Sequence, residues 1–521
     1  MKILYFALFA LLLPCRFAAA QQWAKSYSAG QTVAGQYLGG TEILHLVPHK
    51  GRLYAGNSYW MESRRTLPVA GCQLLSKASP TAPWQEEQEF PGSLRMNNLK
   101  QFIFTRDNNG NLLARPDTVL LANPGNGDGR LIVYLRDDAA NTWVKDSITT
   151  FTYPGADVSV RAAGMHYDAA ANRQYIFLGL KTTGILRGVY TPGLSTKIAW
   201  TIIPELAVGQ EFRVMGFTEL NGVLYCGTSE NGVARIYRRN DSATSPSWTQ
   251  IWTDNQGSTN ADIRGLSAVD RPGGPGQVLW FSWTGSARTL DPATGVAQIE
   301  FSYAPDLAQR LGTPINGVLA AYNDNLLSWY NPLRQATVQL IGFEARYTTP
   351  GPRANVDRWS IDGMYYERAI VNGAVGYTLK NILQNGTTPT DTLLAVRTLC
   401  ASPFASEDGQ VLYAGGYDSN GVPASQTAWV YRGDFGLNPT STRNLRADAA
   451  GVSAYPNPAR SVLTIEVKTH DFRSASLADM AGQVVRRTSA PTLDVQALPA
   501  GLYVLTITLD GGQVTRKIVI Q

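Results

Sequence analysis

The chain has 521 residues, a formal net charge of +5, 16% charged residues, and many Gly (49), Tyr (24) and Trp (12) residues. It is too long for one small core, and this glycine-rich, aromatic composition favours turns and pleated strands over long helices. The net charge is small and contains no basic run, so we predict neither nucleic-acid binding nor attachment to an anionic membrane surface.

The first twenty residues have the pattern of a secretory signal peptide. Lys2 precedes an apolar run at 3–13, and small residues occupy 18–20. Such a segment is removed during export, so we predict a signal peptide at 1–20 and a mature protein outside the cytoplasm. A lipoprotein signal at Cys15 is the alternative. No later apolar run approaches the ~20 residues of a membrane helix, and we predict no transmembrane segment.

Three cysteines remain after the signal peptide, namely Cys72, Cys226 and Cys400. An odd number cannot form a complete set of intramolecular disulfides. We therefore predict buried thiols that pack as small hydrophobic side chains.

A short apolar and aromatic sequence recurs along the chain, as LYAG at 53–56 and again at 412–415. Successive copies start 47 to 86 residues apart, which suits units of four short strands. Several copies are followed by a third strand such as VARIYRR (233–239). The seven copies start at Leu53, Val119, Tyr175, Leu224, Leu279, Leu326 and Leu412. A fourth strand is expected near Trp84, Trp143, Trp200 and Trp248.

The last unit has no fourth strand of its own, whereas QWAKSYS at 22–28 carries Trp23 in the matching place. A circular β-propeller closes in this way, because an N-terminal strand completes the last blade and leaves no open sheet edge. We therefore predict an all-β fold with a seven-bladed β-propeller at 21–435. A further hairpin at 365–382 either extends the sixth blade or forms an eighth.

Four arginines occur at matching places, 11 to 15 residues before a copy of the repeated strand. In a propeller these places lie at the start of innermost strands, around the mouth of the central channel. Converging guanidinium groups would bind a carboxylate, sulfate or phosphate group. The alternative is local pairing with acids such as Glu211 or Asp262. The predicted ligand-binding residues are Arg161, Arg213, Arg264 and Arg397.

The sequence changes character after residue 435. Residues 436–451 form a polar stretch typical of a linker, and 452–521 contain strands that alternate with period two. We predict a small C-terminal β-sandwich there. The residues expected to repeat one facing pattern are Leu463, Ile465 and Val467 in one strand and Leu502, Val504 and Thr506 in another.

Residues 452–521 resemble the type A C-terminal sorting domain of the Por secretion family, which directs proteins to the type IX secretion system of Bacteroidota. The resemblance implies recognition by that machinery, transport across the outer membrane, and attachment to the cell surface or release. It covers about seventy residues and implies no chemistry. The residues that carry it are Tyr455, Pro456, Asn457, Pro458, Asp479, Gly482, Leu498, Ala500, Gly501, Leu502, Tyr503, Lys517, Ile518 and Val519.

Catalytic and metal-binding motifs are absent from the sequence, which has no G-x-S-x-G, H-E-x-x-H or C-x-x-C pattern. Its few histidines include His45 and His49, which lack a third metal ligand nearby in sequence. Calcium is weakly supported by oxygen-bearing turn residues such as Asp107, Asn109 and Asp128, although turn chemistry alone explains them. A Tyr366–Glu367 pair does not form a nucleophile and base, because neighbouring strand residues face opposite ways. No catalytic residue, metal site or cofactor is predicted.

These features favour a secreted or surface-attached binding protein for glycans or proteins, without catalysis. The alternative is a propeller glycoside hydrolase or polysaccharide lyase, which would need suitably spaced acids near the channel. A structural surface component is the third interpretation.

Overall fold

The computed structural model divides into two compact units, residues 21–435 and a C-terminal unit containing residues 436–521. The predicted signal peptide and residues 436–450 of the predicted linker lie outside the described residues. The structure describes residues 22–521 except for 60–68, 126–129, 153–158, 182–183, 202, 207–211, 255–261, 313, 323–325, 333, 348–362, 383–393, 408, 420–425, 436–450, 469–471, 480–483 and 510–511.

Five antiparallel four-stranded sheets follow one another along the larger unit, and within each the strands pair in chain order. The first contains β4 (Glu42–His49), β5 (Arg52–Ser58), β6 (Gly71–Lys77) and β7 (Gln85–Pro91). The second contains β8 (Arg95–Arg106), β9 (Leu112–Gly125), β10 (Arg130–Asp137) and β11 (Thr142–Thr152). The third contains β12 (Val160–Asp168), β13 (Arg173–Leu180), β14 (Ile185–Tyr190) and β15 (Ile198–Trp200).

The fourth sheet contains β16 (Phe212–Leu220), β17 (Val223–Glu230), β18 (Val233–Asn240) and β19 (Ser247–Asp254). The fifth contains β20 (Arg264–Asp270), β21 (Gln277–Trp283), β22 (Ser286–Asp291) and β23 (Val296–Ser302), followed by helix α1 (Tyr303–Leu311). The small pair β2 (Gln31–Val33) and β3 (Gln36–Leu38) stands apart from these sheets. The four tryptophans expected near fourth strands lie in, or one residue before, β7, β11, β15 and β19.

The rest of the unit forms one nine-stranded sheet. Its strands are β24 (Ile315–Ala320), β25 (Leu326–Asn331), β26 (Ala336–Tyr347), β27 (Met364–Val371), β28 (Ala374–Asn381), β29 (Leu394–Ala401), β30 (Val411–Asp418), β31 (Ala428–Asp434) and β1 (Gln22–Ser28). A short 3-10 helix, η3 (Ala405–Glu407), precedes β30.

The hairpin β27–β28 does not make a sheet of its own, because β27 pairs with β26 in antiparallel register. Strand β25 differs from the other six copies of the repeated strand. It pairs with the first half of β26 and has no second neighbour among the described strands, whereas the others pair on both sides. The second half of β26 pairs with β24 instead.

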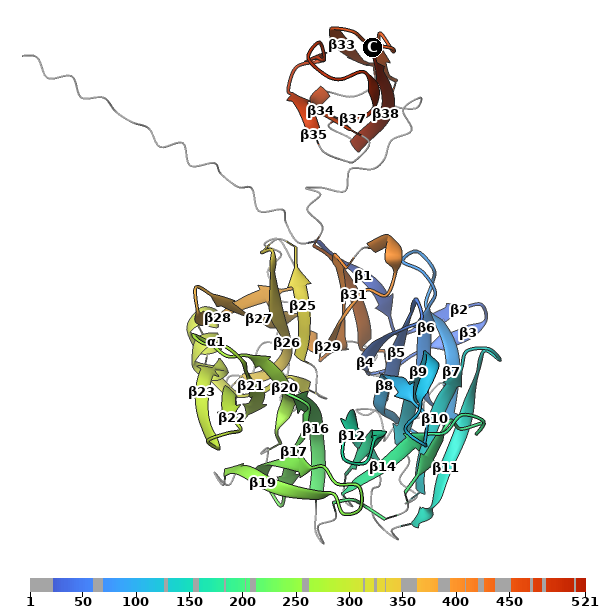
Figure 1. The fold of residues 1–521 in the computed structure, drawn as a ribbon, viewed down its shortest axis with the longest axis vertical. Helices are drawn as coiled ribbons and strands as arrows, with labels where there is room; N and C mark the ends of the chain where they lie inside the picture. The colour runs from blue at the N-terminus through green and yellow to red at the C-terminus, as the bar shows by residue number, and fades with distance from the viewer. Residues whose placement is uncertain are drawn as a thin grey trace, which may run out of the picture. The chain divides into compact units, whose positions relative to one another are not determined.

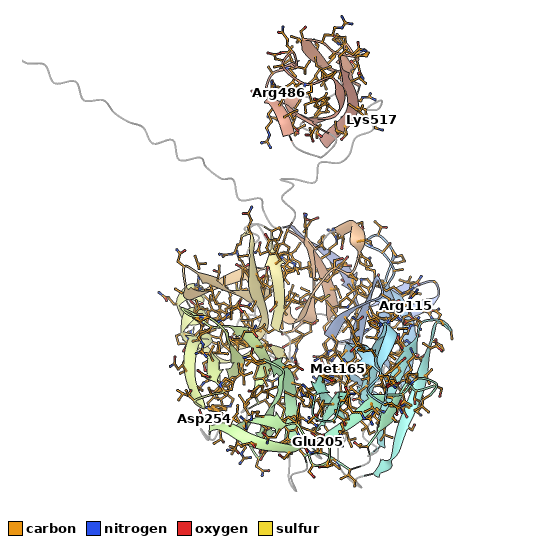
Figure 2. All side chains as sticks on the ribbon, viewed as in Figure 1. Arg115, Met165, Glu205, Asp254, Arg486 and Lys517 are labelled. Atoms are coloured by element: carbon orange, nitrogen blue, oxygen red, sulfur yellow. The ribbon has the colours of Figure 1, made fainter. Side chains whose placement is uncertain are left out.

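Neighbouring sheets contact one another near their first strands, and the series returns to its start. Strand β4 contacts β8, β8 contacts β12, β12 contacts β16, and β16 contacts β20. Strand β26 then contacts β29, which contacts β4. Figure 1 shows these sheets arranged around a common centre. The side chains of the sheets fill the space between them (Figure 2).

The circle of sheets is completed by the first described strand of the chain. Strand β1 pairs antiparallel with β31, from Gln22 opposite Asp434 to Ser28 opposite Trp429. This confirms the predicted pairing of the N-terminal strand with the last repeat unit. Gly433 lies under the Trp23 indole, and a Cβ atom there would approach the ring to 2.7 Å.

Buried aromatic and aliphatic side chains form the cores between neighbouring sheets. Trp84 and Trp143 are at most 8% exposed, so their main role is packing. Cys72, Cys226 and Cys400 are buried and free, and burial raises the pKa of each thiol. No helix among the described residues has the length and apolar character that a membrane span requires.

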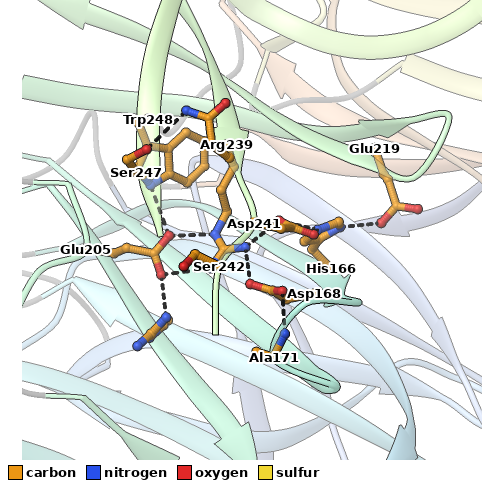
Figure 3. Close-up of polar contacts among 12 residues, drawn as sticks. His166, Asp168, Ala171, Glu205, Glu219, Arg239, Asp241, Ser242, Ser247 and Trp248 are labelled. Atoms are coloured by element: carbon orange, nitrogen blue, oxygen red, sulfur yellow. Dashed lines mark hydrogen bonds and ion pairs between the residues drawn. The ribbon is translucent and has the colours of Figure 1, made fainter. Parts of the chain in front are cut away.

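Buried ion pairs also join neighbouring sheets (Figure 3). The guanidinium of Arg239, at the end of β18, donates to Asp168 (2.8 Å), Glu205 (2.6 Å) and Asp241 (2.6 Å). Asp241 also contacts Nε2 of buried His166 on β12 (3.0 Å), linking the third sheet with the fourth. Three carboxylates around one guanidinium compensate its desolvation.

The first and second sheets repeat this arrangement. Asp138 follows β10 as Asp241 follows β18, and it contacts Nε2 of His49 at 3.1 Å. Arg136 lies two residues before Asp138, as Arg239 lies two residues before Asp241, and it pairs with Glu87 at 3.4 Å. An Arg-x-Asp sequence at the end of a third strand thus binds a histidine of the preceding sheet.

The C-terminal unit contains two antiparallel sheets around one hydrophobic core. One sheet has β32 (Val452–Tyr455), β33 (Val462–Val467) and β36 (Thr492–Asp494). The other has β35 (Val484–Thr488), β34 (Phe472–Ala478), β37 (Gly501–Leu509) and β38 (Gly512–Ile520).

The predicted period-two alternation is present in both strands, and Leu502, Val504 and Thr506 share the face of β37 that is turned away from the core. Leu463 and Ile465 are buried, but the buried residues of β37 are the odd-numbered ones, including Tyr503 and Leu505. Leu502 is 39% exposed.

We expect Trp23→Ala to lower the free energy of unfolding by about 2–4 kcal/mol, because the indole packs edge-on against Tyr365 and Phe435 at the closure. Chemical denaturation followed by tryptophan fluorescence measures this change. Ile203→Ala is the matched control, since Ile203 is 75% exposed and its truncation should change little. Equal stabilities of the Trp23 variant and the native chain would contradict the closure.

We expect Asp168→Asn to lower the free energy of unfolding by about 3–5 kcal/mol at pH 7, because Arg239 would lose one buried counter-charge. Burial raises the pKa of Asp168, but hydrogen bonds from Arg239 and backbone N–H groups outweigh it and hold this pKa below its usual value. The contribution is therefore present above about pH 4 and lost as the pH falls through the folded-state pKa.

Denaturation of both chains at pH 7 and pH 3 tests this expectation. The difference between native chain and variant should shrink at pH 3. Asp270→Asn, at an exposed position on β20, should match the native chain at both pH values. If the difference in free energy of unfolding between native chain and variant were unchanged at pH 3, the role of the Asp168 charge beside Arg239 would be refuted.

Candidate functional site

Three of the predicted sorting residues, Asn457, Lys517 and Val519, meet near the end of β38. The amide of Asn457 donates from Nδ2 to the carbonyl of Lys517 (2.9 Å), and the N–H of Val519 donates to Asn457 Oδ1 (2.8 Å). The side chain of Asn457 thus makes hydrogen bonds with backbone groups of β38, as a neighbouring strand would. Pro456 and Pro458 flank it in the loop after β32.

Other motif residues have separate roles. Tyr503 is buried and its hydroxyl donates to the carbonyl of Pro499 (2.8 Å), whereas Tyr455 is 50% exposed. Gly501 pairs with Ile520 at the start of β37. Gly482 lies outside the described residues.

Two of the four predicted ligand-binding arginines meet around one tyrosine. Tyr322 lies between β24 and β25 and is half-buried. The guanidinium carbon of Arg397 is 3.8 Å from the centre of its ring, and that of Arg264 is 4.5 Å from it. Arg95, which the sequence analysis missed, donates from Nη2 to the phenol oxygen at 3.0 Å. We call these four residues the tyrosine cluster.

The other two predicted arginines lie elsewhere. Arg161 on β12 lines a separate small cavity. Arg213 is half-buried at the start of β16, and its expected partner Glu211 lies outside the described residues. Arg264 also makes the local pair considered as an alternative, since its Nη2 is 3.0 Å from Asp262.

Two buried carboxylates balance the charge of the tyrosine cluster. Glu344 pairs with Arg397 at 2.6 Å and accepts a hydrogen bond from the hydroxyl of Tyr417 at 2.5 Å. Glu42 lies 3.4 Å from Arg397 and 3.7 Å from Arg95. Among the described residues, neither oxygen of Glu42 accepts a hydrogen bond. Desolvation raises the pKa of Glu344, against the opposing effects of Arg397 and Tyr417.

The tyrosine cluster changes the acidity of its phenol. Burial by itself raises the pKa of Tyr322, but the positive charges of Arg95, Arg397 and Arg264 outweigh this effect and lower the pKa to about 7. Tyrosine ordinarily ionises near pH 10. Tyr322 can therefore exchange a proton near neutral pH.

A cavity of about 580 Å³ adjoins the tyrosine cluster through Arg264. The fifth sheet and β24 form its walls, and Arg288 adds a second guanidinium that lies 4.6 Å from the ring centre of Trp283. Within the described part of the chain, the guanidinium of Arg264 pairs with Asp262 at 3.0 Å and that of Arg288 pairs with Asp254 at 3.2 Å. The uncharged polar residues of the wall are Ser282, Thr284, Ser286, Ser302 and Asn316.

The remaining sequence candidates have structural partners. His45 contacts the carbonyl of Asn97 at 3.2 Å, and His49 contacts Asp138 as described above. The carboxylate of Asp107 accepts the backbone N–H groups of Asn109 and Asn111, at 2.8 and 2.9 Å, in a turn.

Asp128 lies outside the described residues. No group of three or more His, Cys, Asp or Glu within the described ranges is arranged to hold a metal ion. Tyr366 donates to Asp306 (2.8 Å), while Glu367 accepts from Asn331 (3.0 Å), so the two have different partners.

The C-terminal unit belongs to a known class of export signals. Residues 453–521 match the family described as "Secretion system C-terminal sorting domain". This unit is therefore a type IX secretion sorting domain, as its motif residues predicted. The domain implies interaction with the type IX secretion machinery and export to the cell surface or the extracellular space. No curated protein matches the chain.

The solved structures to which this chain is similar differ widely in their described roles. A fungal alcohol oxidase of the AA5 family, in complex with copper, is 11% identical, with 97% of this chain and 100% of that chain covered (TM-score 0.42). The extracellular domain of a one-component system from B. thetaiotaomicron is 12% identical, with 95% and 59% covered (0.39). A chain of the mitotic checkpoint complex is 11% identical, with 82% and 98% covered (0.36). Likenesses at this level say nothing about the activity of this chain.

We expect a single tyrosine of the folded protein to ionise near pH 7 and to be lost in Tyr322→Phe. The pKa of Tyr322 is depressed relative to the unfolded chain, so its contribution favours folding increasingly from about pH 7 towards pH 10. Tyrosinate absorbance measured between pH 5 and 9 checks this. Tyr225→Phe is the control, because burial raises the pKa of Tyr225. A native chain without any transition below pH 8 would contradict the assignment.

Proposed function

We propose that residues 21–435 form a seven-bladed β-propeller. Five four-stranded sheets supply five blades, and the nine-stranded sheet supplies two more, β24–β28 and β29–β31 with β1. The contacts between successive first strands and the pairing of β1 with β31 support a closed circle of blades. The pairing of β27 with β26 favours seven blades over eight.

The mature protein follows a two-step route out of the cell. Its predicted signal peptide directs it to the periplasm, and its sorting domain then addresses it to the type IX secretion machinery. The propeller therefore acts at the cell surface or in the surrounding medium.

The propeller binds glycans in the cavity of about 580 Å³ beside the tyrosine cluster. The observation that carries this proposal is the pairing of both wall arginines, Arg264 with Asp262 and Arg288 with Asp254. Each pair offers fixed donors and acceptors side by side, which suits the adjacent hydroxyl groups of a sugar. Packing against Trp283 orients the Arg288 guanidinium.

The size and polarity of the cavity agree with this ligand class. Pockets of about 300–1,000 Å³ hold small organic ligands, and hydroxyl and amide side chains dominate the uncharged polar wall. The described lining of the cavity contains two arginines, Arg264 and Arg288, and one acid, Asp262, which favours a glycan that carries carboxylates. Acidic glycans should therefore bind more tightly than neutral ones.

Cleavage of acidic polysaccharides by β-elimination is the second candidate function. Tyr322, with its pKa lowered to about 7, would take the proton next to a sugar carboxylate. A C=C bond would form as the neighbouring glycosidic C–O bond breaks, and the departing oxygen would take a proton from the Tyr322 hydroxyl or from water. The neighbouring guanidinium groups would stabilise the negative charge that develops on that carboxylate.

Purified full chain on an array of neutral and acidic polysaccharides tests these functions. We expect retention on acidic polysaccharides and a loss of about tenfold or more in affinity for Arg288→Gln, because a charged hydrogen bond contributes roughly 1.5–3 kcal/mol. Arg271→Gln is the control, since Arg271 makes an ion pair with Asp291 and its side chain is 38% exposed.

The same array distinguishes binding from cleavage. Release of unsaturated sugar products that is absent in Tyr322→Phe would establish the lyase. Retention without release would establish a binding protein. Unchanged retention of Arg288→Gln would exclude this cavity as the glycan site.

A further inference from the structure

The cavity of about 580 Å³ lies over the turn that joins β21 to β22 in the fifth sheet. Its lining includes all five residues from Ser282 to Ser286, and Trp283 pairs with Ser286 at the last step of this hairpin. Side chains on the two faces of a sheet are both within reach of a cavity that lies over such a turn.

The two arginines of the cavity belong to opposite faces of the fifth sheet. Arg288 is opposite Phe281 of β21, whereas Arg264 is opposite the next residue, Ser282. Because adjacent residues of a strand point to opposite faces, the two arginine side chains do so as well. Arg288 accordingly forms its ion pair with the fourth sheet, and Arg264 packs on Tyr322, which follows β24.

The spacing of the strands separates the two arginines by more than one sugar ring. Arg264 is on β20 and Arg288 is on β22, with β21 between them. Two steps of about 4.8 Å place β20 and β22 about 10 Å apart. This distance is about twice the length of a sugar ring, so contact with both arginines requires a chain of about three sugar units.

The turn between the two arginines is open to a ligand. Thr284 is exposed, and a Cβ atom placed on Gly285 would meet no atom of the described residues within 4 Å. A glycine without neighbours above it allows close approach to the backbone. The middle of a bound chain therefore has room over Gly285.

We infer that the cavity binds an acidic oligosaccharide of about three sugar units that lies across the β21–β22 turn. One terminal unit places its carboxylate at Arg264, and the other places its carboxylate at Arg288. The inference rests on the proposed binding of acidic glycans in this cavity and adds the length of the recognised chain and its position.

Isothermal titration of the full chain with oligogalacturonates of one to five units, at constant ionic strength, tests the length. We expect the affinity to rise about tenfold or more between one and three units, because the trimer gains a second charge-assisted contact. Further units should add little, since both arginines are then occupied.

Two near-isosteric variants of the turn test the position of the chain. Asp and Asn are both tolerated at positive φ, and Thr284 has a φ of 47°. Thr284→Asp should bind the trimer about fivefold or more weakly than Thr284→Asn, because its carboxylate would repel the middle sugar unit. Asn221→Asp, in the exposed turn between β16 and β17, should bind the trimer like the native chain.

The arginines provide a second, independent measurement. Either Arg264→Gln or Arg288→Gln should lower the trimer affinity about tenfold or more, towards that of the monomer. Thermal melts verify that each variant is folded, and the Thr284 pair still tests the inference if Arg264→Gln fails to fold.

Three results would overturn this inference in a chain that acidic polysaccharides retain. They are the absence of trimer binding, equal affinities for monomer and trimer, and equal trimer affinities of Thr284→Asp and Thr284→Asn. Absence of retention on every acidic polysaccharide would instead overturn the proposed glycan binding itself.

Discussion

The architecture of the larger unit depends on the pairing of β1 with β31. An unpaired edge of a sheet exposes backbone N–H and C=O groups that bind other chains or water. Here the edge of β31 is covered by a strand from the other end of the same unit, with Trp23 packed onto Gly433. Because this pairing joins the ends, the first sheet and the nine-stranded sheet become neighbours, and β29 contacts β4.

The closed arrangement brings charged side chains from distant segments together. These side chains form two kinds of cluster, which differ in their numbers of guanidinium and carboxylate groups. Around Arg239, three carboxylates surround one guanidinium, and the network joins sheets without leaving a cationic group in excess. Around Tyr322, three guanidinium groups meet two buried carboxylates and a phenol whose pKa is about 7. The first arrangement stabilises the fold, whereas the second can exchange protons and adjoins a cavity.

The sorting domain illustrates how a sequence motif can have a structural basis as well as a signalling role. Asn457 hydrogen-bonds to two backbone groups of β38, which carries the last motif residues of the chain. The two ends of the domain are thereby fixed to each other, and exposed Tyr455 lies beside that junction. A mutation of Asn457 would thus affect both the stability of the domain and the surface that the secretion machinery meets.

The sequence alone determined the strand repeats, the completing role of the Trp23 strand and the sorting domain. Each of these depends on local features, namely apolar runs, turn residues and a compact motif. Such features are formed by residues that are close together in the sequence. The sequence also identified Arg264 and Arg397 as related positions. Their meeting around Tyr322, the involvement of Arg95, and the two cavities were decided by tertiary structure. Tyr322 lies outside any repeated strand. The positions of these side chains depend on how the sheets are arranged around their common centre. The repeat period of the sequence does not encode the distance between side chains of different sheets.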